Sequence, residues 1–262
     1  MTRTSLARFT AVAAASLLLT SSVWGTEATA GTINGDLPED VLILGSSLVR
    51  GMKKPLKTFL ELDGEKVKIK ARGPAKWLLQ RHSERPPTAK ALQSRDWDFV
   101  IMAEQSQGTW APERYAGASA LYDKVVELSN AQPMFVMTWR DRGFPPAAYD
   151  GLKGQVGGQV GYVPLAAMLD VPVAPAGWAF RNSIALDELP YDLWKDGHHL
   201  NTRGKYLVAL VVFSVMTGQS PIGLPPQKKL AVGEAAYLQA LAEATIADNA
   251  GEWNLDSNGA LP

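Results

Sequence analysis

Cysteine is absent from the sequence, and this absence excludes disulfide bonds, thiolate metal ligands and a cysteine nucleophile. Net charge is absent too, because 26 lysines and arginines balance 26 aspartates and glutamates among the 262 residues. Bulk charge therefore favours neither nucleic acid nor an anionic membrane as a partner. Two glycine motifs are also missing. The glycines from 151 to 161 do not form Gly-x-Gly-x-x-Gly, and no Gly-x-Ser-x-Gly elbow occurs, so the sequence supports neither nucleotide binding nor an ordinary α/β-hydrolase.

The first thirty residues have the pattern of an export signal. Arg3 and Arg8 supply a basic leader, an apolar run over 9–19 follows, and cleavage fits after Ala30 or, alternatively, after Gly25. The run is too short to span a bilayer comfortably, and no cysteine is available for lipid attachment. We therefore expect an exported protein, periplasmic or secreted, with no stable membrane insertion after cleavage. An uncleaved membrane anchor is the alternative.

Short apolar runs alternate with helical patterns along the rest of the chain. The expected strands cover 40–44, 66–71, 98–103, 134–138 and 171–174. A helix is expected after Ser47 and a short one around 77–79. Further expected helices cover 112–129, 205–217 and 232–249, with broken helices over the glycine-rich segment 147–169. This alternation predicts an α/β fold with a mostly parallel sheet. The expected division of the chain is an export signal over 1–30, one domain over 31–250 and a loose tail over 251–262.

A short polar segment near the C-terminal end concentrates three candidate catalytic groups, Asp196, His198 and His199. An aspartate three residues before a histidine on a loop can reach the ring Nδ1–H and leave Nε2 free as a general base. This spacing favours Asp196 with His199, and His198 is the alternative base. A zinc site from the same side chains is not favoured, because adjacent histidines point in different directions. Asn201 or Thr202 can cap the helix that follows and so pin this loop.

A serine after the first expected strand supplies a nucleophile for this base. The turn Gly45–Ser47 leads from the apolar run 40–44 toward a helix, and ligands of parallel sheets bind at the carboxyl ends of the strands. A serine hydroxyl becomes nucleophilic when a neighbouring base takes its proton and an acid orients that base. A helix cap is the ordinary role for Ser47 taken alone, whereas the distal Asp-x-x-His pattern favours the nucleophile.

These residues resemble the sequence blocks of SGNH (GDSL-type) hydrolases, specifically a branch with Glu-Gln-Ser in place of the usual Gly-x-Asn-Asp. Leu42–Ser47 is similar to the first block, although Ser46 replaces the usual aspartate. Asp196 and His199 are similar to the final Asp-x-x-His block. The resemblance covers about Val41 to Gly223 and implies a three-layer, flavodoxin-like fold with strand order 2-1-3-4-5.

The same resemblance implies an oxyanion hole. Its donors are the backbone N–H groups of Ser47 and Gly73 together with a side chain from the third block. Gln105 is the substitute for the family's asparagine, because its carboxamide can donate the same hydrogen bond from a longer arm. The neighbouring Glu104 fits a buried hydrogen-bond partner that orients this loop.

The resemblance further implies ester hydrolysis through an acyl-enzyme, in which Ser47 attacks the carbonyl and His199 transfers its proton. No metal or organic cofactor is needed. We expect an exported serine esterase that acts on a small-molecule or glycan ester, with acetyl groups on carbohydrate as the leading example. A non-catalytic glycan-binding module on the same fold and an O-acyltransferase are the alternatives.

Three tryptophans and one further histidine complete the candidates. Trp110, Trp139 and Trp178 follow strands or loops at the expected active edge, where indole rings can stack on sugars. A position in the core or the pocket wall is the more ordinary role of each. His82 lies on a basic segment, which favours a solvated surface position.

Overall fold

Five parallel strands form the central sheet of the computed structural model, in the order β2-β1-β3-β4-β5. They are β1 (Asp40–Gly45), β2 (Lys68–Arg72), β3 (Phe99–Ala103), β4 (Gln132–Val136) and β5 (Val173–Ala174). This arrangement confirms the expected α/β fold and the strand order 2-1-3-4-5. The structure describes residues 37–105, 112–154, 161–186 and 191–256, all in one compact unit, and the expected export signal lies outside them.

The two central strands are covered on both faces, which explains their continuous apolar sequences. Residues 41–44 of β1 and 100–103 of β3 are fully buried. β2 lies at the edge of the sheet and instead alternates between exposed and buried residues at its start. In the register of β1 with β3, Gly45 lies opposite Ala103, so the two strands end together. The turn that carries Ser47 therefore starts beside the end of β3.

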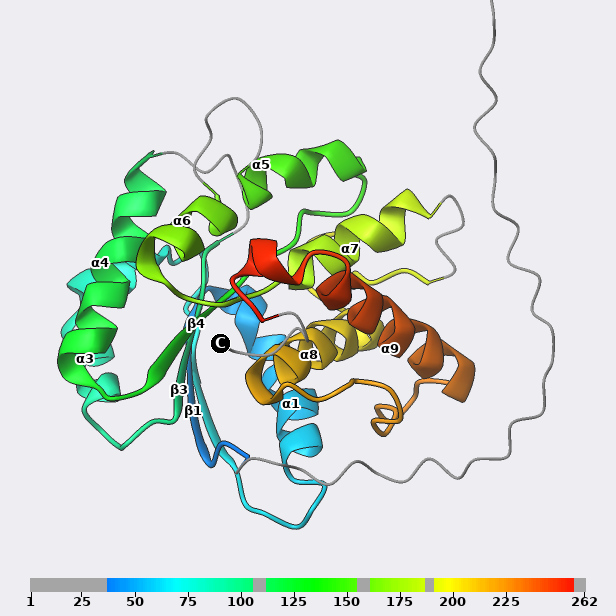
Figure 1. Ribbon diagram of the computed structural model, residues 1–262, viewed down its shortest axis with the longest axis horizontal. Helices are drawn as coiled ribbons and strands as arrows, with labels where there is room; N and C mark the ends of the chain where they lie inside the picture. Colours follow the sequence, from blue (N-terminus) through cyan, green and yellow to red (C-terminus); the bar gives the residue numbers. More distant parts are fainter. Residues whose placement is uncertain (1–36, 106–111, 155–160, 187–190, 257–262) are drawn as a thin grey trace, which may run out of the picture. The chain divides into compact units, whose positions relative to one another are not determined.

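Helices cover both faces of the sheet in three layers (Figure 1). One layer holds α2 (Leu79–Glu84), α3 (Pro86–Leu92), α4 (Pro112–Leu128) and α6 (Tyr162–Leu169). The other holds α1 (Lys53–Leu60), α7 (Ala176–Ala185), α8 (Thr202–Thr217) and α9 (Val232–Ala247). Shorter elements are η1 (Ser47–Gly51), η2 (Pro146–Tyr149), α5 (Asp150–Lys153) and η3 (Ala250–Trp253).

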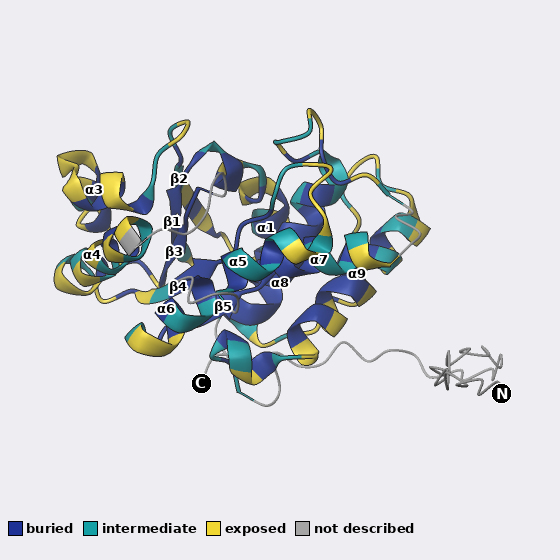
Figure 2. Cartoon of the chain, turned by 90° about the horizontal axis from the view of Figure 1, so that it is seen from above, coloured by how far each residue is buried: buried dark blue, intermediate teal, exposed yellow. Residues whose placement is uncertain are grey.

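Helix α8 is the buried helix that its apolar sequence predicts. Of its 16 residues, 12 are buried, because α1 packs on one side and α9 on the other (Figure 2). Its N-cap is Asn201, whose Oδ1 accepts the backbone N–H groups of Arg203 at 2.8 Å and Gly204 at 3.1 Å. Among the described residues, no helix is both long enough and apolar enough to cross a membrane. The cap fixes the start of α8 directly after the polar loop.

The expected loose tail is wrong over its first residues. Residues 250–253 form η3, and the Trp253 side chain is fully buried. Its ring lies 6.1 Å from that of Trp178, and Lys153 Nζ lies over both rings. A large apolar surface is buried by this contact, so the folded domain extends past residue 250. Residues 257–262 lie outside the described part of the chain.

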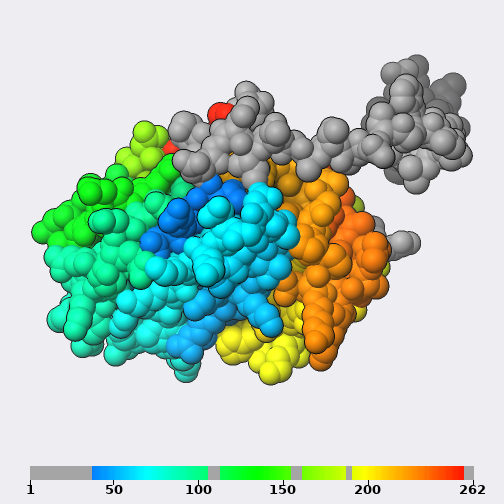
Figure 3. All heavy atoms as spheres, turned by 90° about the horizontal axis from the view of Figure 1, so that it is seen from below, coloured from blue at the N-terminus to red at the C-terminus, as the bar shows by residue number. Residues whose placement is uncertain are grey.

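Two helices have no counterpart in the expected elements. Helix α3 begins at Pro86, where proline is well placed because the first turn of a helix leaves its N–H groups without partners anyway. Helix α7 follows β5 directly and covers the Trp139 region. Segments far apart in the sequence also lie side by side. In Figure 3, the early residues in blue and cyan lie beside the yellow and orange residues that follow position 195.

Candidate active site

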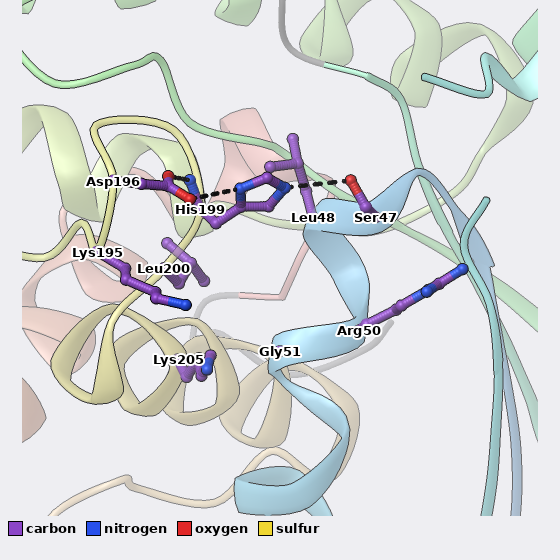
Figure 4. Close-up of a pocket in the computed structure, with 9 residues that line it drawn as sticks. All are labelled: Ser47, Leu48, Arg50, Gly51, Lys195, Asp196, His199, Leu200 and Lys205. Carbon is purple, nitrogen blue, oxygen red and sulfur yellow. Dashed lines mark hydrogen bonds and ion pairs between the residues drawn. The ribbon is translucent and has the colours of Figure 1, made fainter. Parts of the chain in front are cut away.

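Three predicted side chains meet beside the end of β1. Ser47 Oγ lies 3.4 Å from His199 Nε2, and His199 Nδ1 lies 3.0 Å from Asp196 Oδ2 (Figure 4). A carboxylate only accepts hydrogen bonds, so Nδ1 carries the ring proton and Nε2 is left as an acceptor toward the serine. A separation of 3.4 Å is loose but within the range of catalytic contacts without substrate. The arrangement is that of a nucleophile, a base and an orienting acid.

Asp196 is held as an ionised carboxylate by its own loop. Its Oδ1 accepts the backbone N–H groups of His199 at 2.7 Å and His198 at 3.1 Å. The backbone N–H of His199, followed by the His199 ring and the N–H of His198, holds the pKa of Asp196 well below its usual range. Gly197, with a φ of +85°, allows the tight turn between the acid and the histidines. The turn therefore orients the acid before any substrate arrives.

The segment after β4 fastens this loop from a second side. The backbone N–H of Arg142 donates to Gly197 O at 2.7 Å, and its guanidinium donates to Trp194 O at 3.0 Å. The Trp194 indole returns a hydrogen bond to Arg140 O at 3.0 Å. Sequence reasoning missed this clamp, although its signal was the polar run that follows the fourth expected strand.

His198 is occupied elsewhere and is placed as a neighbour of the base. Its Nδ1 is hydrogen-bonded to Asp141 Oδ1, and its ring packs edge-on against that of His199. The bond recorded for Ser47 Oγ goes to His199, the assignment preferred from the sequence. Within the described residues, no group of three or more histidines and acids is arranged to hold a metal ion.

Gly73 lies where the end of β2 meets the nucleophile turn. A Cβ at this position would lie 2.2 Å from Ser46 O, so only glycine permits the close approach. Ser47 is the first residue of η1, and an N–H in the first turn has no acceptor within its own helix. The backbone segments of Ser47 and Gly73, which were expected to form the oxyanion hole, therefore lie next to each other.

Glu104 supports the loop that carries Gln105. Its fully buried carboxylate accepts the backbone N–H of Gln105 at 2.6 Å and that of Leu79 at 3.2 Å. Burial raises the pKa of Glu104 to about 6, against the lowering effect of these hydrogen bonds and of Arg114. The Arg114 guanidinium also binds Gln105 O. Glu104 thus has the structural role expected of it, and Gln105 is buried beside it.

His82 is buried, so the expected surface position is wrong. Its side chain has no solvent exposure, because α2 turns this residue toward the sheet. Nε2 lies 2.8 Å from Gly45 O and must donate, since a carbonyl only accepts, and Nδ1 then accepts from Thr88 Oγ1 at 3.2 Å. Burial lowers the pKa of His82, despite the bond to Gly45 that raises it. The neutral ring therefore braces the residue two positions before Ser47.

The tryptophans proposed for sugar stacking lie in the core. Trp139 is 1% exposed and stacks on Phe180 with ring centroids 5.3 Å apart, and Trp178 is 8% exposed. Rings covered in this way offer no face to a sugar, which supports the structural role for both. The Trp139 indole donates to His198 O at 3.5 Å and so supports the loop that carries His198 and His199. Trp110 lies outside the described residues.

Comparison with known proteins yields structural relatives alone. No family model and no curated protein matches the chain. It is similar to the structure of a DUF4886 family protein from Bacteroides uniformis, with 17% identity, 79% of this chain and 94% of that one covered, and a TM-score of 0.67. It is also similar to a candidate SGNH hydrolase from Slackia heliotrinireducens, with 27% identity, coverage of 68% and 98%, and a TM-score of 0.52.

A third similar structure is LAE5, an α/β hydrolase from the metagenome of Lake Arreo, Spain, with 13% identity, coverage of 69% and 95%, and a TM-score of 0.52. With the parallel 2-1-3-4-5 sheet, these likenesses define an α/β chain of the SGNH-like hydrolase fold. Within that class, this chain is one whose first strand is followed by Ser47, which lies beside a histidine hydrogen-bonded to an aspartate.

Proposed function

We propose that this protein is a serine esterase of the SGNH type that works through Ser47, His199 and Asp196. The observation that carries the proposal is the 3.4 Å contact of Ser47 Oγ with the His199 Nε2 that lacks a proton. That contact gives the serine a base, and the base is already oriented by a carboxylate. The solved structures of similar fold that are described as hydrolases add support.

The reaction follows from these positions. Ser47 Oγ attacks the ester carbonyl carbon while its proton moves to His199 Nε2, and the same proton then passes to the leaving alcohol. Water attacks the resulting acyl-serine, gives a proton to Nε2 and releases the carboxylic acid as Ser47 regains its hydrogen. The backbone N–H groups of Ser47 and Gly73 and the Gln105 carboxamide are the proposed donors to the oxyanion.

Hydrolysis is favoured over acyl transfer by the openness of the site. The His199 side chain is 48% exposed, so water can reach the acyl-enzyme beside the base. The proposed substrate is a short acyl ester, acetyl on a small molecule or glycan, met outside the cytoplasm after residues 1–30 direct export. N-terminal sequencing of the protein recovered from a periplasmic or secreted fraction would test export and the cleavage position.

A chromogenic acetyl ester assay tests the reaction. Wild type should hydrolyse the ester, whereas Ser47→Ala and His199→Ala should each lose roughly 10⁴-fold or more in kcat. The matched control is Ser94→Ala, an exposed serine on the far side of the sheet, which should keep full activity. Equal rates in all four proteins would overturn the proposal.

Covalent labelling separates the enzyme from a glycan-binding module. A fluorophosphonate should modify wild type at Ser47, located by mass spectrometry of the labelled peptide, and should leave Ser47→Ala unmodified. Glycan binding by a wild-type protein that does not label would favour the module. Acyl transfer would appear as an acylated sugar product when a sugar acceptor is added to the assay.

A further inference from the structure

A cavity of about 330 Å³ opens directly beside the nucleophile (Figure 4). Ser47 and His199 form one part of its wall, so a substrate bound at the serine must occupy it or pass it. Three basic residues are also among those that line the cavity, Arg50, Lys195 and Lys205. This gathering of like charge stands out in a chain whose formal net charge is zero.

The one acid in the lining offsets only part of this positive charge. Asp196 is the single carboxylate among the lining residues, and its oxygens already accept from the His199 ring and two backbone N–H groups. Within the described part of the chain, no ion pair is formed by any of the three basic residues, Arg50, Lys195 and Lys205. Clustered cations that outnumber the acids beside them attract an anion.

The cations approach Ser47 from two sides. Arg50 extends from η1 on the side of Gly73: a Cβ on that glycine would lie 3.3 Å from the arginine Cγ. Lys205 comes from α8 and lays its stem across Gly51, where an added Cβ would lie 2.9 Å from its Cγ. Lys195 comes from the loop that carries the acid and the base. Lys195 and Lys205 thus bring positive charge to the same side of η1, whereas the Arg50 side chain leaves η1 on the other side (Figure 4).

We propose that this cavity binds an anionic group of the substrate, so that the ester hydrolysed at Ser47 belongs to an acidic molecule. The inference rests on the proposed esterase function and narrows its substrate class. A carboxylate fits the cavity best as the anion, because the ammonium groups of Lys195 and Lys205 can both donate to its oxygens. The carboxylate belongs either to the acyl group or to the alcohol.

Two pairs of esters distinguish these sources. The acyl pair is mono-4-nitrophenyl succinate against 4-nitrophenyl butyrate, which differ in a terminal carboxylate against a methyl group. The alcohol pair is an O-acetylated methyl glucuronoside against the O-acetylated methyl glucoside. Wild type should show a kcat/KM roughly fivefold or more higher for the anionic member of one pair, as expected for unit charges about 4 Å apart near a solvated surface. Rates of Ser47→Ala supply the blank for uncatalysed hydrolysis.

Charge removal should erase this preference. Lys195→Gln and Lys205→Gln should each lower the ratio of anionic to neutral kcat/KM by roughly threefold, and Lys195→Arg should retain it. Raising the salt concentration from about 0.02 M to about 0.5 M should compress the ratio in wild type. Lys90→Gln, an exposed lysine on α3 across the sheet, is the matched control and should leave the ratio unchanged.

The outcomes separate this inference from the proposed function. Ser47-dependent hydrolysis with a ratio near one for both pairs, or a ratio that persists in Lys195→Gln/Lys205→Gln, overturns the anion site and leaves the esterase standing. Loss of all Ser47-dependent hydrolysis overturns the esterase. The anion site is then judged by calorimetry of monobutyl succinate with the intact protein, where binding must weaken in the double lysine variant.

Discussion

The tautomer of His199 decides what Ser47 can do. With Nδ1–H committed to Asp196, the lone pair of Nε2 faces the serine hydroxyl. Asp196 itself stays ionised, because the backbone N–H of His199, the His199 ring and the N–H of His198 lower the pKa of this carboxyl group. A neutral amide in its place would remove both the charge and the constraint on the ring.

The first prediction concerns Asp196→Asn. The new NH₂ group would face Nδ1, so the ring proton would move to Nε2 and the base would no longer accept from Ser47. We expect kcat to fall by roughly 10⁴-fold with a much smaller change in KM. Steady-state kinetics on a chromogenic ester measures this, and a loss of less than tenfold would contradict the assigned role.

The second prediction concerns Gly73→Ala. The added methyl would lie 2.2 Å from Ser46 O and must displace the nucleophile turn. We expect the unfolding free energy to fall by about 1–3 kcal/mol and kcat to fall by roughly 10²-fold. Urea unfolding and ester kinetics report the two effects. Gly233→Ala is the control, because its added methyl meets no atom within 4 Å, and an equal effect there would refute the close-contact explanation.

The third prediction concerns Gln105. If its carboxamide stabilises the oxyanion, Gln105→Ala should lower kcat by roughly 10²- to 10³-fold while KM changes little. Fluorophosphonate labelling of the variant should slow as well, since the phosphonyl oxygen occupies the same hole. Retention of wild-type kcat would assign the third donor to another group.

At the scale of elements, α2 braces two strand ends at once. Its residue Leu79 donates a backbone N–H to Glu104 after β3, and His82 donates to Gly45 O at the end of β1. The helix therefore holds the nucleophile turn and the Gln105 loop in one frame. Both contacts involve buried titratable groups, so the frame responds to pH.

The fourth prediction is a pH dependence from His82. The folded state lowers the pKa of this ring below its ordinary 6.5, so in acid the unfolded chain binds a proton that the native protein does not. Stability from His82 is therefore fully present above pH 6.5 and is lost as the pH falls below that value. His82→Gln keeps a donor toward Gly45 O without titrating, and its unfolding free energy should decline less below pH 6.5 than that of wild type.

Glu104 acts in the opposite direction and must be separated from His82. Its pKa rises from 4.5 to about 6 on folding, so its contribution is greatest below pH 4.5 and is lost as the pH rises through 6. The difference between wild type and His82→Gln at each pH cancels this effect, because both proteins keep Glu104. A difference that stays constant from neutral to acidic pH would show that His82 does not titrate as described.

The sequence predicts an element correctly where the pattern that indicates it lies within a few adjacent residues. The apolar runs of β1 and β3 and the caps around α8 follow from a few adjacent residues, and the Asp196–His199 spacing is likewise short-range. His82 was misplaced because the nearby Arg81 and Arg85 are exposed, while its own ring lies on the inward face of a short helix. Asp141 and the Arg142 clamp were missed since their partners lie some 50 residues away.

At the scale of the whole molecule, the segment around Trp253 packs against the rest of the folded chain. Trp253 is buried against Trp178 and Lys153, although nothing within its local sequence indicates a helix or a strand. A single aromatic residue in a polar stretch carries no periodic signal, so its burial depends on a surface assembled by α7 and α5. The loose tail was predicted for that reason.

The fifth prediction follows from the burial of Trp253. Trp253→Ala should lower the free energy of unfolding by about 3–5 kcal/mol, because it leaves a large cavity beside Trp178. Urea unfolding measures the loss, and Val232→Ala, at a residue that is 78% exposed, should change stability by less than about 0.5 kcal/mol. A comparably small change in Trp253→Ala would restore the view that this end is loose.

The serine and its base lie 152 residues apart in sequence. Neither half of the chain holds both groups of the proposed catalytic pair, since the hydroxyl follows the first strand and the imidazole follows the fifth. Contacts between distant segments form late in folding because a long loop must close before they are gained. In the proposed esterase, the reactivity of Ser47 would therefore depend on completion of the whole sheet. Before that point the proposed nucleophile would be an ordinary hydroxyl, because no base would lie beside it.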